Sequence, residues 1–176
     1  RYALVEIENI HDAGLEFEPI FRVLFDLHGD FTAAVTDYFA GECRVESVDS
    51  MPAMTAIVDA QTGAEHAIGV VRPGGYDVVY VSNPPSNLPV GTIQAFLDDW
   101  GKNGGFERID YVHGKDVVER LGSQEGNLGI YLPAIGKDTF FKTVIVDGAL
   151  PRKTFSMGEA KEKRFYLESR RITESS

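Results

Sequence analysis

Arg152, Lys153 and Thr154 form the strongest candidate site that the sequence offers for a phosphate or carboxylate group. Such an anion requires guanidinium or ammonium groups beside hydroxyl donors, and Lys163 and Arg164 add two further cations. The alternative is a basic segment that folds across an acidic domain and offsets its charge. The charge distribution fits both interpretations equally well.

The chain is acidic as a whole but basic at its end. Its 176 residues include 17 Lys and Arg and 27 Asp and Glu, which gives a formal net charge of −10. The first 150 residues hold 10 of the cations and 23 of the acids, so the remaining 26 residues carry a net charge of +3. An acidic total disfavours binding to the backbone of DNA or RNA, whereas the basic end indicates where a smaller anion would bind.

A second candidate is the corner at His113, Gly114 and Lys115, where a predicted strand turns into a helix. Backbone N–H groups at such a corner, a glycine that allows close approach and a neighbouring lysine can form an anion site. His113 adds a group that can transfer a proton near neutral pH. The alternative, which we favour for this segment, is a glycine corner with a surface histidine, since the full spacing of a phosphate-binding loop is missing.

Acidic residues near the start of the chain form a third candidate. Residues 3–8 and 15–25 predict a hairpin with Asp12 in its loop, in which Glu8 and three other glutamates share one face. Such a cluster would call for Mg²⁺ or for a cation such as Arg22. The favoured alternative is a solvated polar face, so we predict no resident metal ion.

Hydrophobic periodicity and turn residues predict strands and helices that are interleaved along the chain. We expect one α/β domain of the α+β type over residues 1–176, with helices packed on a mixed, largely antiparallel sheet. Further strands are expected at 43–48, 67–72, 76–82, 106–112, 127–132 and 164–172. Helices are expected at 31–40, 52–60, 89–102, 116–121 and 138–146. Asp30, Ser50 and Asp138 are the predicted N-caps of the first, second and last of these helices.

Several classes of protein are excluded or unsupported. No apolar run approaches the roughly 20 residues that cross a bilayer, and the single Cys43 suits a reducing compartment, so we expect a cytoplasmic protein. The common hydrolase, zinc-protease, Walker and dinucleotide-binding motifs are missing from the sequence. His11, His28 and His66 have no ligand spacing, and we expect ordinary polar or packed positions for them.

Five segments, at 4–9, 14–19, 111–114, 148–155 and 162–168, resemble the uncharacterised bacterial and archaeal family known as domain of unknown function 1015. The resemblance covers nearly the whole chain. Its most specific part is the run Pro-Arg-Lys-Thr-Phe, which is followed by a basic segment.

The resemblance implies that this chain is the C-terminal part of a longer protein. Family members are about twice as long and carry upstream a histidine- and arginine-rich motif similar to that of ParB-like proteins, which is absent here. The chain also begins at Arg1 without Met and without a leader. The family often has His-Arg where this chain has Phe21 and Arg22, which puts any role of that histidine in doubt.

Some ParB-like proteins bind nucleotides, and some are kinases of free serine. The resemblance therefore implies the phosphate- and nucleotide-binding wall of a small-metabolite kinase that uses ATP or ADP with Mg²⁺. The missing N-terminal domain would complete the site, and this chain alone would be inactive. The alternative is a non-catalytic interaction or oligomerisation module, in which the basic end docks on an acidic surface and forms a homodimer; binding to DNA is disfavoured by the net charge.

Overall fold

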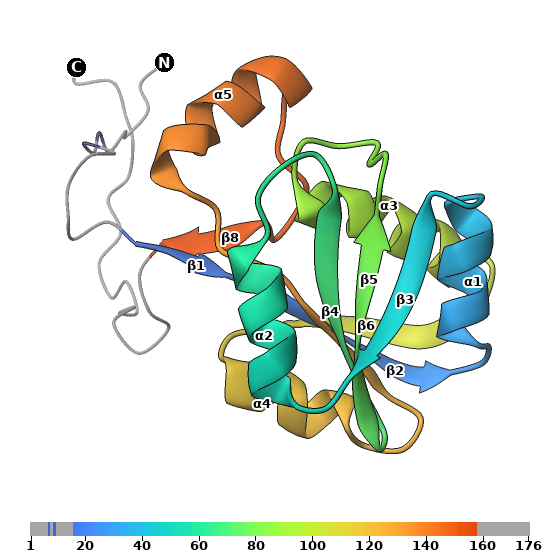
Figure 1. The fold of residues 1–176 in the computed structure, drawn as a ribbon. Helices are drawn as coiled ribbons and strands as arrows, with labels where there is room; N and C mark the ends of the chain where they lie inside the picture. Colours follow the sequence, from blue (N-terminus) through green and yellow to red (C-terminus); the bar gives the residue numbers. More distant parts are fainter. Residues whose placement is uncertain (1–6, 8, 10–15, 158–176) are drawn as a thin grey trace, which may run out of the picture.

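Residues 7, 9 and 16–157 are described by the computed structural model, and the structural statements below concern them (Figure 1). The helices among them are α1 (Phe31–Tyr38), α2 (Met51–Ala60), α3 (Pro89–Lys102), α4 (Lys115–Gly122) and α5 (Lys137–Asp147). The strands are β1 (Phe17–Pro19), β2 (Phe21–Leu27), β3 (Cys43–Val48), β4 (His66–Arg72), β5 (Gly75–Val81), β6 (Phe106–Val112), β7 (Leu128–Tyr131) and β8 (Phe155–Met157). None of these helices has the length and apolar composition needed to cross a bilayer.

Six of the strands form one sheet in the order β3-β5-β4-β7-β2-β6. All its neighbouring pairs are antiparallel. β1 and β8 form a separate antiparallel pair, with Phe17 opposite Met157 and Pro19 opposite Phe155, beside the large sheet (Figure 1). The predicted α+β class, with helices packed on a largely antiparallel sheet, is confirmed, and among the described strands there is no parallel pair.

Helices cover both faces of the six-stranded sheet. α1 and α3 pack on one face against residues such as Ile68 and Val70, and α2 and α4 pack on the other against Ala67 and Val71. Successive residues of a strand point to opposite faces, so β4 is buried continuously over residues 66–71. This double coverage explains why the sequence shows an unbroken apolar run there rather than an alternation.

Capping residues set the start of two helices as predicted. The side chains of Asp30 and Ser50 each accept a hydrogen bond from the backbone N–H three residues later, at 3.0 and 3.3 Å. The cap predicted at Asp138 is wrong. The backbone is still extended at Gly136 (φ −70°, ψ 141°) and becomes helical directly afterwards, so Asp138 lies inside the first turn of α5.

The second strand of the predicted N-terminal hairpin is divided in the structure. The extended segment predicted at 15–25 is divided at Ile20, because β1 pairs with β8 while β2 pairs with β6 and β7. β8 itself was not predicted. The predicted strands at 3–8 and 164–172 lie outside the described residues.

One end of the large sheet gathers most of the candidate residues. The first residues of β2, β3 and β4 lie at this end, together with the last residues of β5, β6 and β7. The register shows this, because Arg22 near the start of β2 lies opposite Tyr111 near the end of β6, and His66 at the start of β4 lies opposite Val81 at the end of β5. The loops that follow β5, β6 and β7 and the segment that enters β2 therefore share this end, which we call the Arg22 end.

Candidate functional site

Arg22, the second residue of β2, is completely buried on the α3 face of the sheet. Its Nε donates a hydrogen bond to Gln94 Oε1 at 3.2 Å, its Nη2 donates to the carbonyl oxygen of Arg152 at 3.3 Å, and its Nη1 donates to the carbonyl oxygen of Ile20. Burial is the main cause that lowers the pKa of Arg22 to about 10, so the guanidinium is still charged at neutral pH. β2 thus carries a positive charge into the interior.

The carboxylate of Asp98 is bonded directly to one guanidinium group, that of Arg152, and is linked indirectly to a second, that of Arg22. Asp98 Oδ1 accepts a hydrogen bond from Gln94 Nε2 at 2.9 Å and from Arg152 Nη2 at 2.6 Å. Gln94 therefore links Asp98 to the buried Arg22. The three charged side chains sum to one positive charge, which favours the approach of an anion.

Tyr111 completes the surroundings of Arg22. It lies opposite Arg22 on β6, and its ring centroid is 5.3 Å from the guanidinium carbon. Its Oη is buried and has no hydrogen-bond partner among the described residues. A buried hydroxyl without a partner costs about 1–3 kcal/mol, and in folded proteins such groups commonly mark the place of a water molecule or ligand.

The segment Pro151–Thr154, which we call the Arg152 turn, is held from two sides. Thr154 is buried, and its Oγ1 donates a hydrogen bond to the carbonyl oxygen of Pro151, while Arg22 holds the carbonyl oxygen of Arg152. Lys153 has a φ of 55°, a left-handed conformation that costs a non-glycine residue roughly 1–2 kcal/mol. The side chains of Arg152 and Lys153 are exposed, so the turn carries two adjacent cations on the surface.

A pocket of about 310 Å³ lies next to the Arg152 turn and is lined by the first residue of the turn, Pro151, and by the two residues that precede it. This volume is at the lower end of the range found for small-molecule sites. Its lining combines hydroxyl-bearing and apolar side chains from the loop after β5, from α3 and from α5, and includes Pro85, Ser86, Leu88, Gly91, Thr143 and Pro151.

The corner at residues 113–115 lies at the same end of the sheet but has different neighbours. Gly114 is the N-cap of α4 with a φ of 89°, and a Cβ there would lie 2.7 Å from Asp116 Oδ1. Lys115 Nζ is 3.1 Å from Asp59 Oδ2, and Tyr131 donates its hydroxyl hydrogen to the same carboxylate. Because carboxylates already surround this corner, it suits a phosphate less well than the Arg152 turn does. Its predicted role in phosphate binding stays a prediction.

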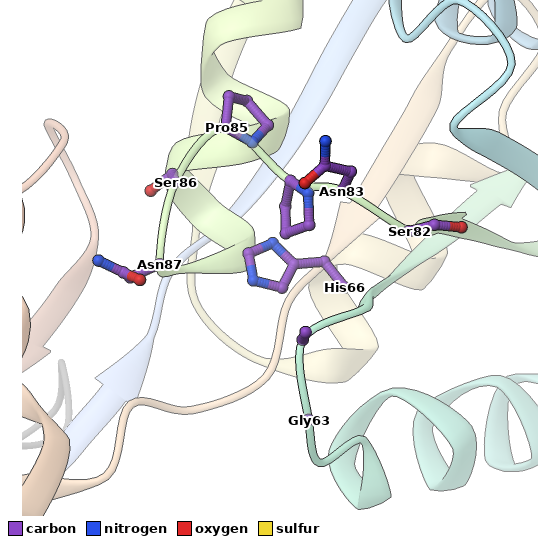
Figure 2. Close-up of a pocket in the computed structure, with 9 residues that line it drawn as sticks. Gly63, His66, Ser82, Asn83, Pro85, Ser86 and Asn87 are labelled. Atoms are coloured by element: carbon purple, nitrogen blue, oxygen red, sulfur yellow. The ribbon is translucent and has the colours of Figure 1, made fainter.

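His66 lies in another pocket of the Arg22 end, which has a volume of about 340 Å³ (Figure 2). Its Nδ1 is 3.0 Å from Thr92 Oγ1, and burial lowers the pKa of His66, so the imidazole is neutral at pH 7. The histidine is packed, as expected, yet its place in a polar pocket was not predicted. The rest of the polar lining comes from Ser82, Asn83, Ser86 and Asn87.

The structure thus brings together part of the predicted site. Arg22 contacts the backbone of Arg152, and Lys153 and Thr154 belong to the same turn, whereas Glu8, Asp12, Lys163 and Arg164 lie outside the described residues. Sequence reasoning missed Gln94 and Asp98, and it included Tyr111 only as part of the segment that leads to His113, without a role of its own. Of these residues, Gln94 could have been suspected from the sequence, because it is a polar residue among the apolar positions that α3 buries. Within residues 16–157, no three His, Cys, Asp or Glu side chains are grouped as a metal ion would require.

Comparison with known proteins identified no relatives: no family model, no curated protein and no solved structure matches this chain. The resemblance to domain of unknown function 1015 stays a prediction, and function has to be argued from the site itself.

Proposed function

We propose that this domain binds a small anionic ligand at the Arg152 turn and so forms the phosphate-binding wall of a small-metabolite kinase. The observation that supports this proposal is the charge balance, in which Asp98 pairs directly with Arg152 and is linked to Arg22 only through Gln94, so that two guanidinium groups stand against one carboxylate. The kinase part of the proposal follows from the family resemblance, with free serine as an example of a substrate and ATP or ADP with Mg²⁺ as the cofactor.

The two exposed cations would have distinct roles. Arg152 offers a planar donor group that matches two oxygens of a phosphate, and Lys153 adds a point charge beside it. Arg22 is a positioning residue, because it acts through the carbonyl oxygen of Arg152. Phosphoryl transfer depends mainly on positioning and on stabilisation of charge, so a domain can contribute cations while the remaining groups come from elsewhere.

Calorimetric titration of this chain with inorganic phosphate, and separately with ATP and MgCl₂, tests the anion site. We expect saturable binding that Arg152→Ala weakens about tenfold, the effect of losing one charged hydrogen bond worth roughly 1.5 kcal/mol. Arg108→Ala is the matched control, because Arg108 is an exposed arginine paired with Asp110 on the edge strand β6. Equal weakening by both variants, or no binding, would contradict the proposal. Transfer of phosphate to free serine is then measured with the longer protein.

A second candidate function is an interaction module, and exposed apolar side chains on α5 favour it. Ile145 is 81% exposed and Val146 is 66% exposed, and Met157 of β8 is also exposed. Large apolar side chains that are exposed together can mark an interaction surface.

Size-exclusion chromatography at low and high salt tests this alternative. If α5 mediates self-association, a dimer should persist at high salt and be lost in Ile145→Glu, because apolar contacts are not screened by salt. A dimer formed by the basic end on an acidic surface would instead dissociate as salt increases. A monomer under both conditions would argue against an oligomerisation module.

A further inference from the structure

A third pocket of the Arg22 end lies on the opposite face of β2, toward α2 and α4. Phe21 belongs to the core on that face, while its neighbour Arg22 points to α3. The pocket has a volume of about 320 Å³, and its floor is formed by Phe21 and Tyr131, whose rings are stacked with centroids 4.7 Å apart. Both rings are almost completely buried, at 2% exposed for Phe21 and 1% for Tyr131, so they support the pocket from beneath and a ligand would make its direct contacts with the polar lining.

The charged groups of this pocket have the opposite balance to those around Arg152. Glu18 and Asp59 contribute two carboxylates, and Lys115 contributes one ammonium group. The lining thus carries charged groups of both signs, with one net negative charge. A ligand with both an ammonium group and a carboxylate matches these groups, because each of its charges finds an opposite charge in the lining.

Asp59 is held in a defined orientation. Tyr131 Oη lies 3.0 Å from each of its carboxylate oxygens, and the tyrosine itself is buried. Lys115 Nζ lies 3.1 Å from Asp59 Oδ2 and 5.2 Å from the centroid of the Tyr131 ring, so an ammonium group already occupies the space above the ring. The Lys115 side chain is 56% exposed, which allows it to exchange Asp59 for an anionic group of a ligand.

We infer that this pocket binds a small zwitterion of the amino-acid class, whose ammonium group contacts Asp59 and Glu18 and whose carboxylate contacts Lys115. The inference shares its ligand class with the example substrate of the proposed function, free serine, but it concerns a different pocket and does not depend on the Arg152 turn. The alternative is a purely structural tether between α2, which carries Asp59, and α4, which carries Lys115.

NMR titration of the ¹⁵N-labelled chain with L-serine, sodium acetate and methylammonium chloride distinguishes the two interpretations. We expect L-serine to shift the amide signals of Gly114, Lys115 and Ala134 saturably, and the two single-charge probes to bind at least tenfold more weakly. Absence of saturable shifts, equal binding of acetate, or shifts confined to residues outside the pocket would overturn the inference.

Variants assign the ligand contacts. Asp59→Asn should weaken the binding of L-serine at least tenfold, whereas Asp37→Asn, at an exposed aspartate of α1, should leave it unchanged. If Asp59→Asn fails to fold, Lys115→Met provides the same test at an exposed position. Unchanged L-serine binding in the folded variant would overturn the inference. Arg152→Ala should not affect L-serine binding, and Asp59→Asn should not affect phosphate binding, so failure of this inference and failure of the anion site are separable.

Discussion

Tyr111 and Arg22 illustrate how single side chains can mark a site that no motif reveals. Arg22 is a buried cation whose partners are mainly neutral, and Tyr111 is a buried hydroxyl without a partner among the described residues. Each arrangement costs free energy in a folded protein. Their proximity, with 5.3 Å between the guanidinium carbon and the ring centroid, supports a polar ligand at this place.

Replacement of Tyr111 tests whether its hydroxyl has a partner. We expect Tyr111→Phe to leave the free energy of unfolding unchanged or to raise it by about 1 kcal/mol, because the substitution removes a buried polar atom that forms no hydrogen bond. Urea denaturation measures this difference. A loss of more than about 1 kcal/mol would show that the hydroxyl is bonded outside the described residues.

The contact between α4 and β7 depends on two glycines. A Cβ added to Gly122 would lie 2.6 Å from the backbone nitrogen of Gly129 and 2.8 Å from its Cα, and backbone atoms cannot move aside as a flexible side chain can. This close packing fixes α4, and with it Lys115 at its start, against the sheet.

Gly122→Ala should therefore destabilise the protein by about 1–3 kcal/mol, the usual cost of overpacking. Gly29→Ala is the matched control, because a Cβ there meets its nearest atom, in Trp100, at an ordinary 3.8 Å. Thermal unfolding of both variants provides the measurement. Equal melting temperatures of the two variants would show that α4 can shift without cost.

Local patterns predicted most of the individual elements. The strands at 43–48 and 106–112 and the helix at 89–102 have the predicted bounds, because turn residues and period are both encoded within each segment. The pairing of β1 with β8 and the bond from Arg22 to Arg152 join residues more than 100 positions apart. No local pattern encodes such contacts, so the sequence could suggest Arg22 and Arg152 separately but could not predict that they meet.

One buried carboxylate, that of Asp77 on β5, gives the stability of the whole domain a defined dependence on pH. Asp77 is buried between β3 and β4, and although burial raises its pKa, hydrogen bonds from Arg72 and Ser47 lower it by more, so the net shift is downward. Because the pKa of Asp77 is lower in the folded protein than in the unfolded chain, the ionised carboxylate stabilises the folded protein at every pH above the ordinary pKa of aspartate. This stabilisation is lost as the pH falls through the lowered pKa of the folded protein.

We accordingly expect Asp77→Asn to lower the melting temperature by about 4 °C at pH 7, the shift that roughly 1–2 kcal/mol produces in a domain of this size. The difference between the wild type and the variant should shrink as the pH is lowered below about 4, where the aspartate of the unfolded chain becomes protonated. Melting curves from pH 7 to pH 3 test this, with Asp37→Asn as the exposed control. A difference that stays constant over this range would contradict it.

The long separation in sequence between Arg22 and the Arg152 turn has a consequence for the order in which the proposed anion site would form during synthesis. Arg22 and the carbonyl group that it holds are separated by 130 residues, so a nascent chain exposes Arg22 long before the Arg152 turn has been made. The large sheet can form from residues 21–131, but its buried arginine gains its last partner, the carbonyl oxygen of Arg152, only when the Arg152 turn has left the ribosome. Anion binding would therefore require that Arg22 has already bonded the Arg152 turn. An anion present in the cell would stabilise only the completely folded domain.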